Sequence, residues 1–406
     1  MFGIHIGNTN ASIAYCKENG EVSLITNESG DRQTSTIVTF TDEGIITFGD
    51  TAQKDMSKTI THNKSAMASQ NLNGDTFHNQ VETRMENNIF SYCIPQKGNI
   101  QYVTPQDIMV LILKQLLASA KSALGVKNDC FNCVLLMPES FPEEYCKNYK
   151  TAAEEAGWKV IQVINEASAA VLAYSLLDYE DKLSETIIVY RLGGTTCEIT
   201  GSEISKGMVT IIGSTYKEDI GGNLFTDVLA NYLADQFVKK YKLDPRERRR
   251  SFEKLKLEAK NCVNILSNLP TVTCLIESLH EGLDLSVNLS RARFELIIKP
   301  TLERCIEPLR VFIKEFELNG SIDKVVLCGG GVNVPSLKHA VSSLFDGTTT
   351  EVLAHCNSEE VLAKGGAKQA YYLSQAKYDY SEMLPRSMDV GQPVEVENAE
   401  LVYDVY

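Results

Sequence analysis

The chain has 406 residues, of which 53 are acidic and 39 basic, and its formal net charge is −14. This charge argues against broad binding to DNA or to an anionic membrane. The length exceeds what one compact domain usually holds. Eleven cysteines, scattered along the chain and odd in number, do not resemble a disulfide framework. We therefore expect a reduced, cytosolic chain with no DNA and no membrane among its partners.

Two turns of the same type lie about half a chain apart. Near the start, an apolar run at residues 2–4 precedes Gly7-Asn8-Thr9, and later a run at 187–190 precedes Gly193-Gly194-Thr195-Thr196. Each pattern predicts a β-hairpin whose tip can offer backbone N–H groups and hydroxyls to a phosphate. The repeat indicates a duplicated fold that holds one nucleotide between two lobes.

Strands alternate with helices along the rest of the chain, which predicts an α/β fold. Thr104 and Pro105 begin a helix that ends at Gly125, because threonine caps a helix and proline suits its first turn. A strand at 133–138 leads into a helix over 142–157, and a strand at 325–331 leads into one over 334–345, which extends the duplication. Further helices are predicted over 222–241, 245–266, 290–316 and 357–375.

Three further features concern metals and partners. Cys130 and Cys133 form the only CxxC pair, and without a second pair or two histidines they predict no metal site. The basic run Arg246–Arg250 is either a solvated helix start or a contact with RNA or an acidic partner. Residues 378–406 carry seven acidic side chains and predict a flexible tail.

Several segments, in order along the chain, resemble the nucleotide-binding domain of the seventy-kilodalton heat-shock chaperones. They are GIHIGNTNAS at 3–12, INEASAA at 164–170, IGG at 220–222, ESLHEG at 277–282, SRARFE at 290–295, VLCGGGVNVP at 326–335 and NSEEVLAKG at 357–365. The resemblance implies the duplicated actin-like (ribonuclease-H-like) two-lobed ATPase fold. Lobe I would then be residues 1–181 with helix 359–376 returning to it, lobe II 182–358, and the tail 377–406.

The resemblance also implies an ATP site with magnesium, and this chain departs from it at the metal. The family orients the metal's waters with one aspartate in each lobe, and the matching residues here are His5 and Arg191. Because neither is a carboxylate, no metal ligand is predicted. Glu166 matches a position that the family uses in catalysis, and Glu198 replaces a further aspartate. These two glutamates are the candidate catalytic residues.

Other family side chains are also replaced. An ungapped match puts Ala68 at the position of the catalytic lysine, and Lys64 is the nearest lysine. The helix that clamps adenine has Val263 among its matched positions, and Asn333 replaces an arginine that stacks on the base. The candidate nucleotide-binding residues are His5, Gly7, Asn8, Thr9, Arg191, Gly193, Gly194, Thr195, Thr196, Gly221, Gly222, Lys260, Asn264, Ser267, Gly329, Gly330, Gly331 and Asn333.

Basic residues at two equivalent positions leave three alternatives. In the first, hydrolysis has lapsed and the site is only structural. In the second, Arg191 holds phosphate oxygens in place of magnesium and His5 adds a pH-dependent donor, so that ATP or ADP is a structural ligand. In the third, rearranged ligands still support an ATPase, although the loss of metal and lysine charge should raise the barrier to phosphoryl transfer.

Within the family, the resemblance favours the atypical ribosome-associated branch, that of the fourteenth human-type member and the zuotin partner. It implies a regulatory co-chaperone that pairs with a zuotin-like J-domain protein at the ribosome and helps an active chaperone to fold nascent chains. The alternatives are an active ATP-dependent chaperone ATPase and a nucleotide-free scaffold. The chain ends about thirty residues after the last matched helix, so we expect no complete substrate-binding cycle from it.

Overall fold

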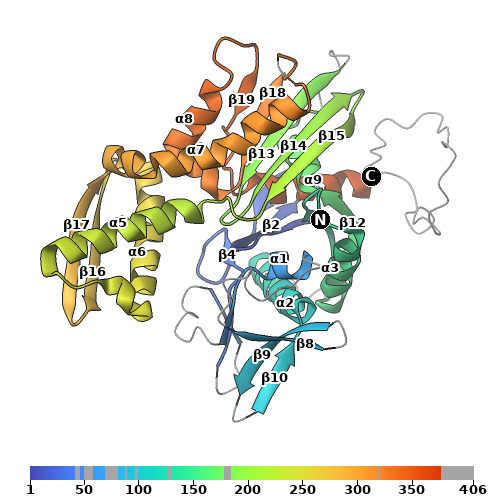
Figure 1. Cartoon of the computed structure of the whole chain (residues 1–406). Helices are drawn as coiled ribbons and strands as arrows, with labels where there is room; N and C mark the ends of the chain where they lie inside the picture. The colour runs from blue at the N-terminus through green and yellow to red at the C-terminus, as the bar shows by residue number, and fades with distance from the viewer. Residues whose placement is uncertain are drawn as a thin grey trace.

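The structure is a computed structural model that describes residues 1–41, 46–49, 58–68, 81–86, 89–96, 99–125, 130–177, 184–318 and 320–375. Its two largest sheets form the centres of two lobes (Figure 1). The first sheet contains the N-terminal hairpin, in which β1 (Phe2–Ile6) pairs antiparallel with β2 (Asn10–Cys16). On the other side of β1, the parallel strands β11 (Phe131–Met137) and β12 (Trp158–Asn165) follow. Beyond β2 lie β3 (Val22–Leu24) and β4 (Thr34–Ser35).

The second sheet repeats this arrangement. The strand β13 (Glu185–Leu192) pairs antiparallel with β14 (Cys197–Ser205) and parallel with β18 (Lys324–Cys328). The outer strands are β15 (Met208–Lys217) and β19 (Glu351–Leu353). The second sheet, in the order β15-β14-β13-β18-β19, matches the order β3-β2-β1-β11-β12 of the first sheet, and the paired strands run in the same relative directions. The predicted α/β class and the predicted duplication are therefore confirmed.

Helices of the first lobe cover the face of its sheet that carries Phe2, Ile4 and Ile6. The longest is α2 (Pro105–Leu124), and its predicted ends are confirmed: Thr104 and Asp107 form a capping box, and Gly125 adopts the left-handed conformation. Two tyrosines of α3 (Glu143–Glu155) are buried in the same core. The short helix α1 (Asn63–Ala68) also reaches this core, whereas α4 (Glu166–Ala173) packs on the opposite face of the sheet with Val134 and Leu136.

In the second lobe, α7 (Arg291–Glu315) and α8 (Pro335–Ser343) lie beside the sheet (Figure 1). The helices α5 (Asn223–Tyr241) and α6 (Arg249–Asn268) stand apart from it, together with the hairpin of β16 (Thr271–His280) and β17 (Leu283–Ser290). The predicted helix over 245–266 is interrupted: Asp244 caps a separate short turn, η3 (Pro245–Glu247), and α6 begins only at Arg249.

One pair of cysteines differs from the expectation. The sequence predicted a reduced chain without a disulfide framework, whereas the structure pairs the sulfurs of Cys262 of α6 and Cys274 of β16. The two residues are close because α6 packs directly on the hairpin, and both side chains are buried in the core of the second lobe. The other nine cysteines, Cys130 and Cys133 included, carry free thiols.

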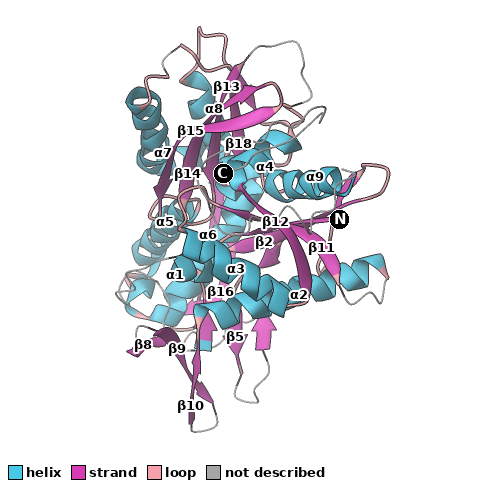
Figure 2. Cartoon of the chain, turned by 90° about the vertical axis from the view of Figure 1, so that its right-hand side faces the viewer, coloured by secondary structure: helices cyan, strands magenta, loops and turns pink. Residues whose placement is uncertain are grey.

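The last helix, α9 (Val361–Gln375), returns to the first lobe and packs on β1, β2 and α4, where the two sheets face each other (Figure 2). Its glycines permit this contact. A Cβ on Gly365 would lie 1.8 Å from the carbonyl oxygen of Ala169, and one on Gly3 would lie 2.2 Å from the nitrogen of Ala367. The first strand and the last helix are therefore packed backbone to backbone.

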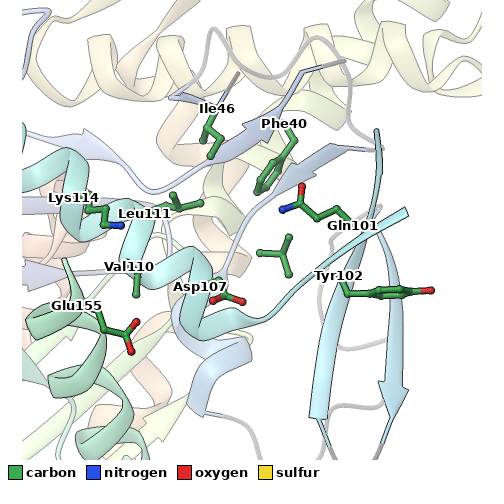
Figure 3. Close-up of a pocket in the computed structure, with 10 residues that line it drawn as sticks. Phe40, Ile46, Gln101, Tyr102, Asp107, Val110, Leu111, Lys114 and Glu155 are labelled. Carbon is green, nitrogen blue, oxygen red and sulfur yellow. The ribbon is translucent and has the colours of Figure 1, made fainter. Parts of the chain in front are cut away.

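Two small sheets extend the first lobe. They are formed by β5 (Val38–Phe40), β6 (Ile46–Phe48) and β7 (Thr59–Ile60), and by β8 (Glu82–Glu86), β9 (Ile89–Gln96) and β10 (Asn99–Val103). A pocket between α2, β5 and β10 is lined by Phe40, Val110 and Leu111 together with Asp107 and Lys114 (Figure 3). None of its lining residues belongs to the candidate site. The predicted acidic tail lies outside the described residues, and no helix within the described ranges is long and apolar enough to span a bilayer.

Candidate functional site

The two Gly-Thr turns meet between the lobes. Each turn is closed by a hydrogen bond of 2.8 Å from the nitrogen of its first glycine, Gly7 or Gly193. The side-chain amide of Asn8 donates to Thr195 Oγ1 at 3.1 Å. A Cβ on Gly194 would lie 2.5 Å from Cγ2 of Thr9. The tips of the two hairpins are thus in direct contact with each other.

A buried cluster of charges lies beside these turns, and Glu166 is its centre. Glu166 is the first residue of α4, held there because Asn165 caps the helix by accepting from the nitrogen of Ser168. Its carboxylate lies 2.6 Å from Lys64 Nζ, 2.6 Å from Arg191 Nε and 3.5 Å from His5 Nε2. Since Arg191 belongs to β13 and Glu166 to α4, this ion pair joins the two lobes.

The second carboxylate of the cluster is Glu198. It stands opposite Arg191 in the register of β13 and β14, and its Oε2 lies 3.3 Å from Arg191 Nε. Its Oε1 accepts from the nitrogen of Glu139 in the first lobe at 2.9 Å. Arg191 Nη1 also donates to Thr196 Oγ1 at 3.3 Å. We call His5, Lys64, Glu166, Arg191 and Glu198 the interlobe cluster.

Burial and neighbouring charges shift the pKa values of the cluster in different directions. Burial would raise the pKa of Glu166, but Arg191 and Lys64 outweigh it and hold that pKa well below its usual range. For Glu198 burial prevails over Arg191 and raises the pKa to about 7. Burial lowers the pKa of Lys64 and of His5, although Glu166 opposes both shifts. Arg191 remains a cation at every pH at which the protein is folded, because its neighbouring carboxylates outweigh burial and raise its pKa further.

Aromatic rings pack against the cluster. The guanidinium carbon of Arg191 lies 6.0 Å from the ring centre of Tyr216, and Lys64 Nζ lies 5.7 Å from that of Phe141. The rings of Phe141 and Tyr216, one from each lobe, meet edge to face with centres 5.2 Å apart. These bulky side chains exclude water from the cluster and strengthen its charge interactions.

The predicted glycines of the second lobe allow close backbone packing around the second turn. The nitrogen of Gly222 donates to the carbonyl oxygen of Gly193 at 2.9 Å. A Cβ on Gly221 would lie 2.5 Å from the carbonyl oxygen of Gly194. Gly329 has a φ of +90° and precedes η4 (Gly330–Asn333). A Cβ on Gly331 would lie 2.7 Å from the side chain of Leu192.

The residues predicted to surround a base lie on α6 and η4, and two of them already contact protein groups. The hydroxyl of Ser267 donates to the carbonyl oxygen of Val263 at 2.9 Å. Asn333 Oδ1 accepts from Ser358 Oγ at 2.7 Å. Asn264 is exposed. Lys260 lies close enough to Glu359 to oppose the rise in that carboxyl's pKa which burial causes. Their assignment to nucleotide binding stays a prediction.

The interlobe cluster does not fit a resident magnesium ion. Both of its carboxylates face Arg191, and in the part of the chain that the structure describes no three His, Cys, Asp or Glu side chains are placed to hold a metal. An anionic group fits better. Arg191 Nη2 is a buried guanidinium nitrogen without a hydrogen-bond partner, and such a donor suits a phosphoryl oxygen.

Sequence reasoning missed two members of this environment. Lys64, and not Ala68, enters the site, because α1 carries it towards Glu166. The signal available was that Lys64 was the nearest lysine to the expected position. Tyr216 was not singled out, and its aromatic ring five residues before Gly221 was the only indication.

Comparisons with known proteins agree with the fold. A model of the family described as Hsp70 protein matches residues 1–390. Heat shock 70 kDa protein 14 of Danio rerio is 31% identical over 376 residues, which cover 91% of this chain and 74% of that protein. The protein of the same name from Xenopus tropicalis is 32% identical over 377 residues, which cover 91% of this chain and 73% of that protein. The Homo sapiens protein of this name is 31% identical over 376 residues, with the same two coverages of 91% and 73%.

These matches and the duplicated sheets agree with the actin-like, two-lobed ATPase fold of an Hsp70 nucleotide-binding domain. The matched model implies nucleotide binding, and the relatives bear the name of a chaperone family that works with J-domain co-chaperones. The chain belongs to the Hsp70 family.

Proposed function

We propose that this protein is a regulatory co-chaperone that binds ATP or ADP as a structural ligand, hydrolyses it weakly or not at all, and acts with a J-domain partner on nascent chains. The observation that carries the proposal is the ion pair of 2.6 Å between Arg191 and Glu166. A carboxylate whose pKa is held well below its usual range by two cations is a poor base. Glu166 is therefore badly suited to assist the attack of a water molecule.

The same cluster still suits a phosphate. When Glu198 is protonated, which its pKa of about 7 allows at neutral pH, Glu166 is the one carboxylate of the cluster that faces Arg191 and Lys64. The buried nitrogen Nη2 of Arg191, which lacks a partner, would donate to a phosphate oxygen, and His5 Nε2 lies beside the same carboxylate as Arg191. Positive charge that the protein itself supplies would replace the metal in binding, but it would not position a nucleophilic water.

A calorimetric titration with ATP, in Mg²⁺ and again in EDTA, tests the proposal together with single-turnover hydrolysis. We expect binding of similar affinity in both buffers and a hydrolysis rate that Glu166→Gln leaves unchanged. Arg310→Gln, on the exposed face of α7, is the matched control for a charge change outside the site. Binding that needs Mg²⁺, with turnover that is lost in Glu166→Gln, would overturn the proposal in favour of an active chaperone ATPase.

The partner, the ribosome and the cytosolic location are part of the proposal and rest on the resemblance. Two arginines of the basic run face carboxylates, Arg246 with Asp235 and Arg248 with Glu281, and the contact of this run with RNA stays an alternative. Co-purification with a J-domain protein, sedimentation with ribosomes and stimulation of a separate Hsp70 ATPase test this part. A chain that forms no stable pair with any J-domain protein would refute it.

A nucleotide-free scaffold is the second candidate, and one observation favours it. The two turns contact each other directly, through Asn8 and Thr195 and through Thr9 and Gly194. In a scaffold the melting temperature would not respond to ATP at any concentration, whereas a ligand that binds only the folded state must raise it. A rise in melting temperature with ATP in EDTA therefore separates the two candidates.

A further inference from the structure

The disulfide between Cys262 and Cys274 lies midway along the contact between α6 and the β16–β17 hairpin, and hydrogen bonds stabilise this contact on either side of it. At one end Ser251 Oγ lies 3.2 Å from His280 Nδ1. Near the same end, Lys254 Nζ of α6 donates to the carbonyl oxygen of Ser278 at 2.9 Å. At the other end Arg291, the residue directly after β17, donates from Nε to the carbonyl oxygen of Leu266 at 2.7 Å. The disulfide joins α6 and β16 between these points, with its Cα atoms 6.5 Å apart. The hairpin is thus attached to α6 independently of the covalent bond.

The core around the two sulfurs is complete without that bond. Both cysteine side chains are fully buried in one apolar cluster with neighbours such as Leu266, Ile276 and Leu285. A thiol packs as a small apolar side chain, so the reduced pair fits the same space. The hydrogen bonds at the two ends then keep α6 on the hairpin. The fold therefore does not depend on whether these cysteines are oxidised or reduced.

The position of the pair connects it to the candidate site. Cys262 faces the core from α6, while Lys260, Asn264 and Ser267 of the same helix belong to the candidate nucleotide-binding residues. A covalent link from the buried side of α6 to β16 restricts how far this helix can move. The effect on nucleotide affinity rests on the proposed function, whereas the chemistry of the pair does not.

We propose that Cys262 and Cys274 form a reversible oxidation site that exchanges with a small disulfide of the glutathione type. One cysteine thiolate attacks the small disulfide and displaces a glutathione thiolate, which leaves a mixed disulfide. The second cysteine thiolate attacks the protein-bound sulfur and displaces the second glutathione. In sum, two protein thiols lose two electrons and two protons, and one glutathione disulfide becomes two glutathione thiols.

Access to the sulfurs comes from opening of the hairpin. Among the described strands, β16 and β17 pair only with each other, and they form the outer layer over α6 (Figure 1). Thr273 and Leu275, on either side of Cys274, are exposed. A two-stranded layer of this kind opens locally at a lower cost than the whole lobe unfolds, and opening uncovers Cys274 and Cys262 together.

The test uses the full chain in buffers of increasing ratio of oxidised to reduced glutathione, with free thiols alkylated before peptide mass spectrometry. We expect the Cys262–Cys274 linkage to appear over one reversible transition and the melting temperature to rise with it by about 2–4 °C. Cys305→Ala, which removes a free thiol from the same core, should keep the transition. Cys262→Ala should abolish both the linkage and the rise.

Three outcomes would overturn the proposal. A linkage that persists in a large excess of reduced glutathione would make the bond purely structural. A pair that stays alkylated at every ratio would mean that it does not oxidise. A rise in melting temperature that survives in Cys262→Ala would assign the effect to another thiol. None of these measurements involves nucleotide or a J-domain protein, so their failure is distinct from a failure of the proposed function.

Discussion

Replacement of Arg191 by methionine tests whether the interlobe cluster holds the lobes together. The side chain of Arg191 is 6% exposed and lies against Glu166 and Glu198, which are 2% and 4% exposed. Methionine keeps much of the length but removes the charge, which leaves two buried carboxylates with Lys64 as their nearest cation. Removal of one partner of a buried ion pair typically costs about 3–5 kcal/mol. We expect a loss of this size in the free energy of unfolding.

Arg310 provides the matched control. It also pairs with two carboxylates, Glu303 at 2.8 Å and Glu307 at 3.4 Å, but on an exposed face of α7. Exposed ion pairs contribute about 0–1 kcal/mol, so Arg310→Met should change the free energy of unfolding by no more than that. Burial is the main difference between the two arginines, and the comparison measures its effect.

The assay is equilibrium unfolding in urea, without nucleotide or Mg²⁺. The double variant Arg191→Met with Glu166→Gln completes a mutant cycle, and it should recover part of the loss because no unpaired charge remains at Glu166. If Arg191→Met cost no more than Arg310→Met, the reasoning would be refuted. The lobes would then be held together by the contacts of α9 and the aromatic rings, and not by the cluster.

Three other predictions follow from single contacts. The pKa of Glu198 is raised to about 7 in the folded state, so between pH 5 and 7 the folded protein binds a proton that the unfolded chain releases. The free energy of unfolding should therefore fall by about 2–3 kcal/mol as the pH rises from 5 to 8. Thermal melts should show this fall in the wild type and not in Glu198→Gln. Gly194→Ala should lower the free energy of unfolding by about 1–3 kcal/mol because the new Cβ would collide with Thr9. Urea unfolding of the double variant Gly194→Ala with Thr9→Ala should show that the second change restores stability. If the double variant lost as much stability as Gly194→Ala alone, the collision would be contradicted. Ser290→Ala should cost about 1 kcal/mol, since Ser290 caps α7 by accepting from the nitrogen of Arg293, while Ser290→Thr should retain most of the stability in the same assay.

Much of the fold could be predicted from the sequence because its signals are local. The ends of α2 follow from Thr104, Pro105 and Gly125, which act within one turn of the helix. The two hairpins follow from apolar runs beside glycines, and their repetition predicted the duplicated sheet. The start of α6 was misplaced because Asp244 caps a separate turn first, and a competing cap of this kind is hard to weigh in a sequence.

The site could be predicted only in part, because its contacts join residues far apart in the chain. His5, Glu166, Arg191 and Glu198 were all named, yet nothing local indicates that Arg191 reaches Glu166 across the lobes. Lys64 was not assigned for the same reason: its partner is Glu166, more than a hundred positions away. The disulfide was missed because Cys262 and Cys274 become neighbours only when the hairpin folds back on α6.

The packing of α9 on β1 has a consequence for synthesis of the protein on the ribosome. Residues of β1 are made long before their partners on α9. Until that helix emerges, Gly3 and the adjoining face of the sheet have no cover. Contacts between the ends of a chain slow folding and prolong the exposure of apolar surface. The first lobe therefore stays open during translation until α9 has been made, and α9 sets the time at which this lobe can close.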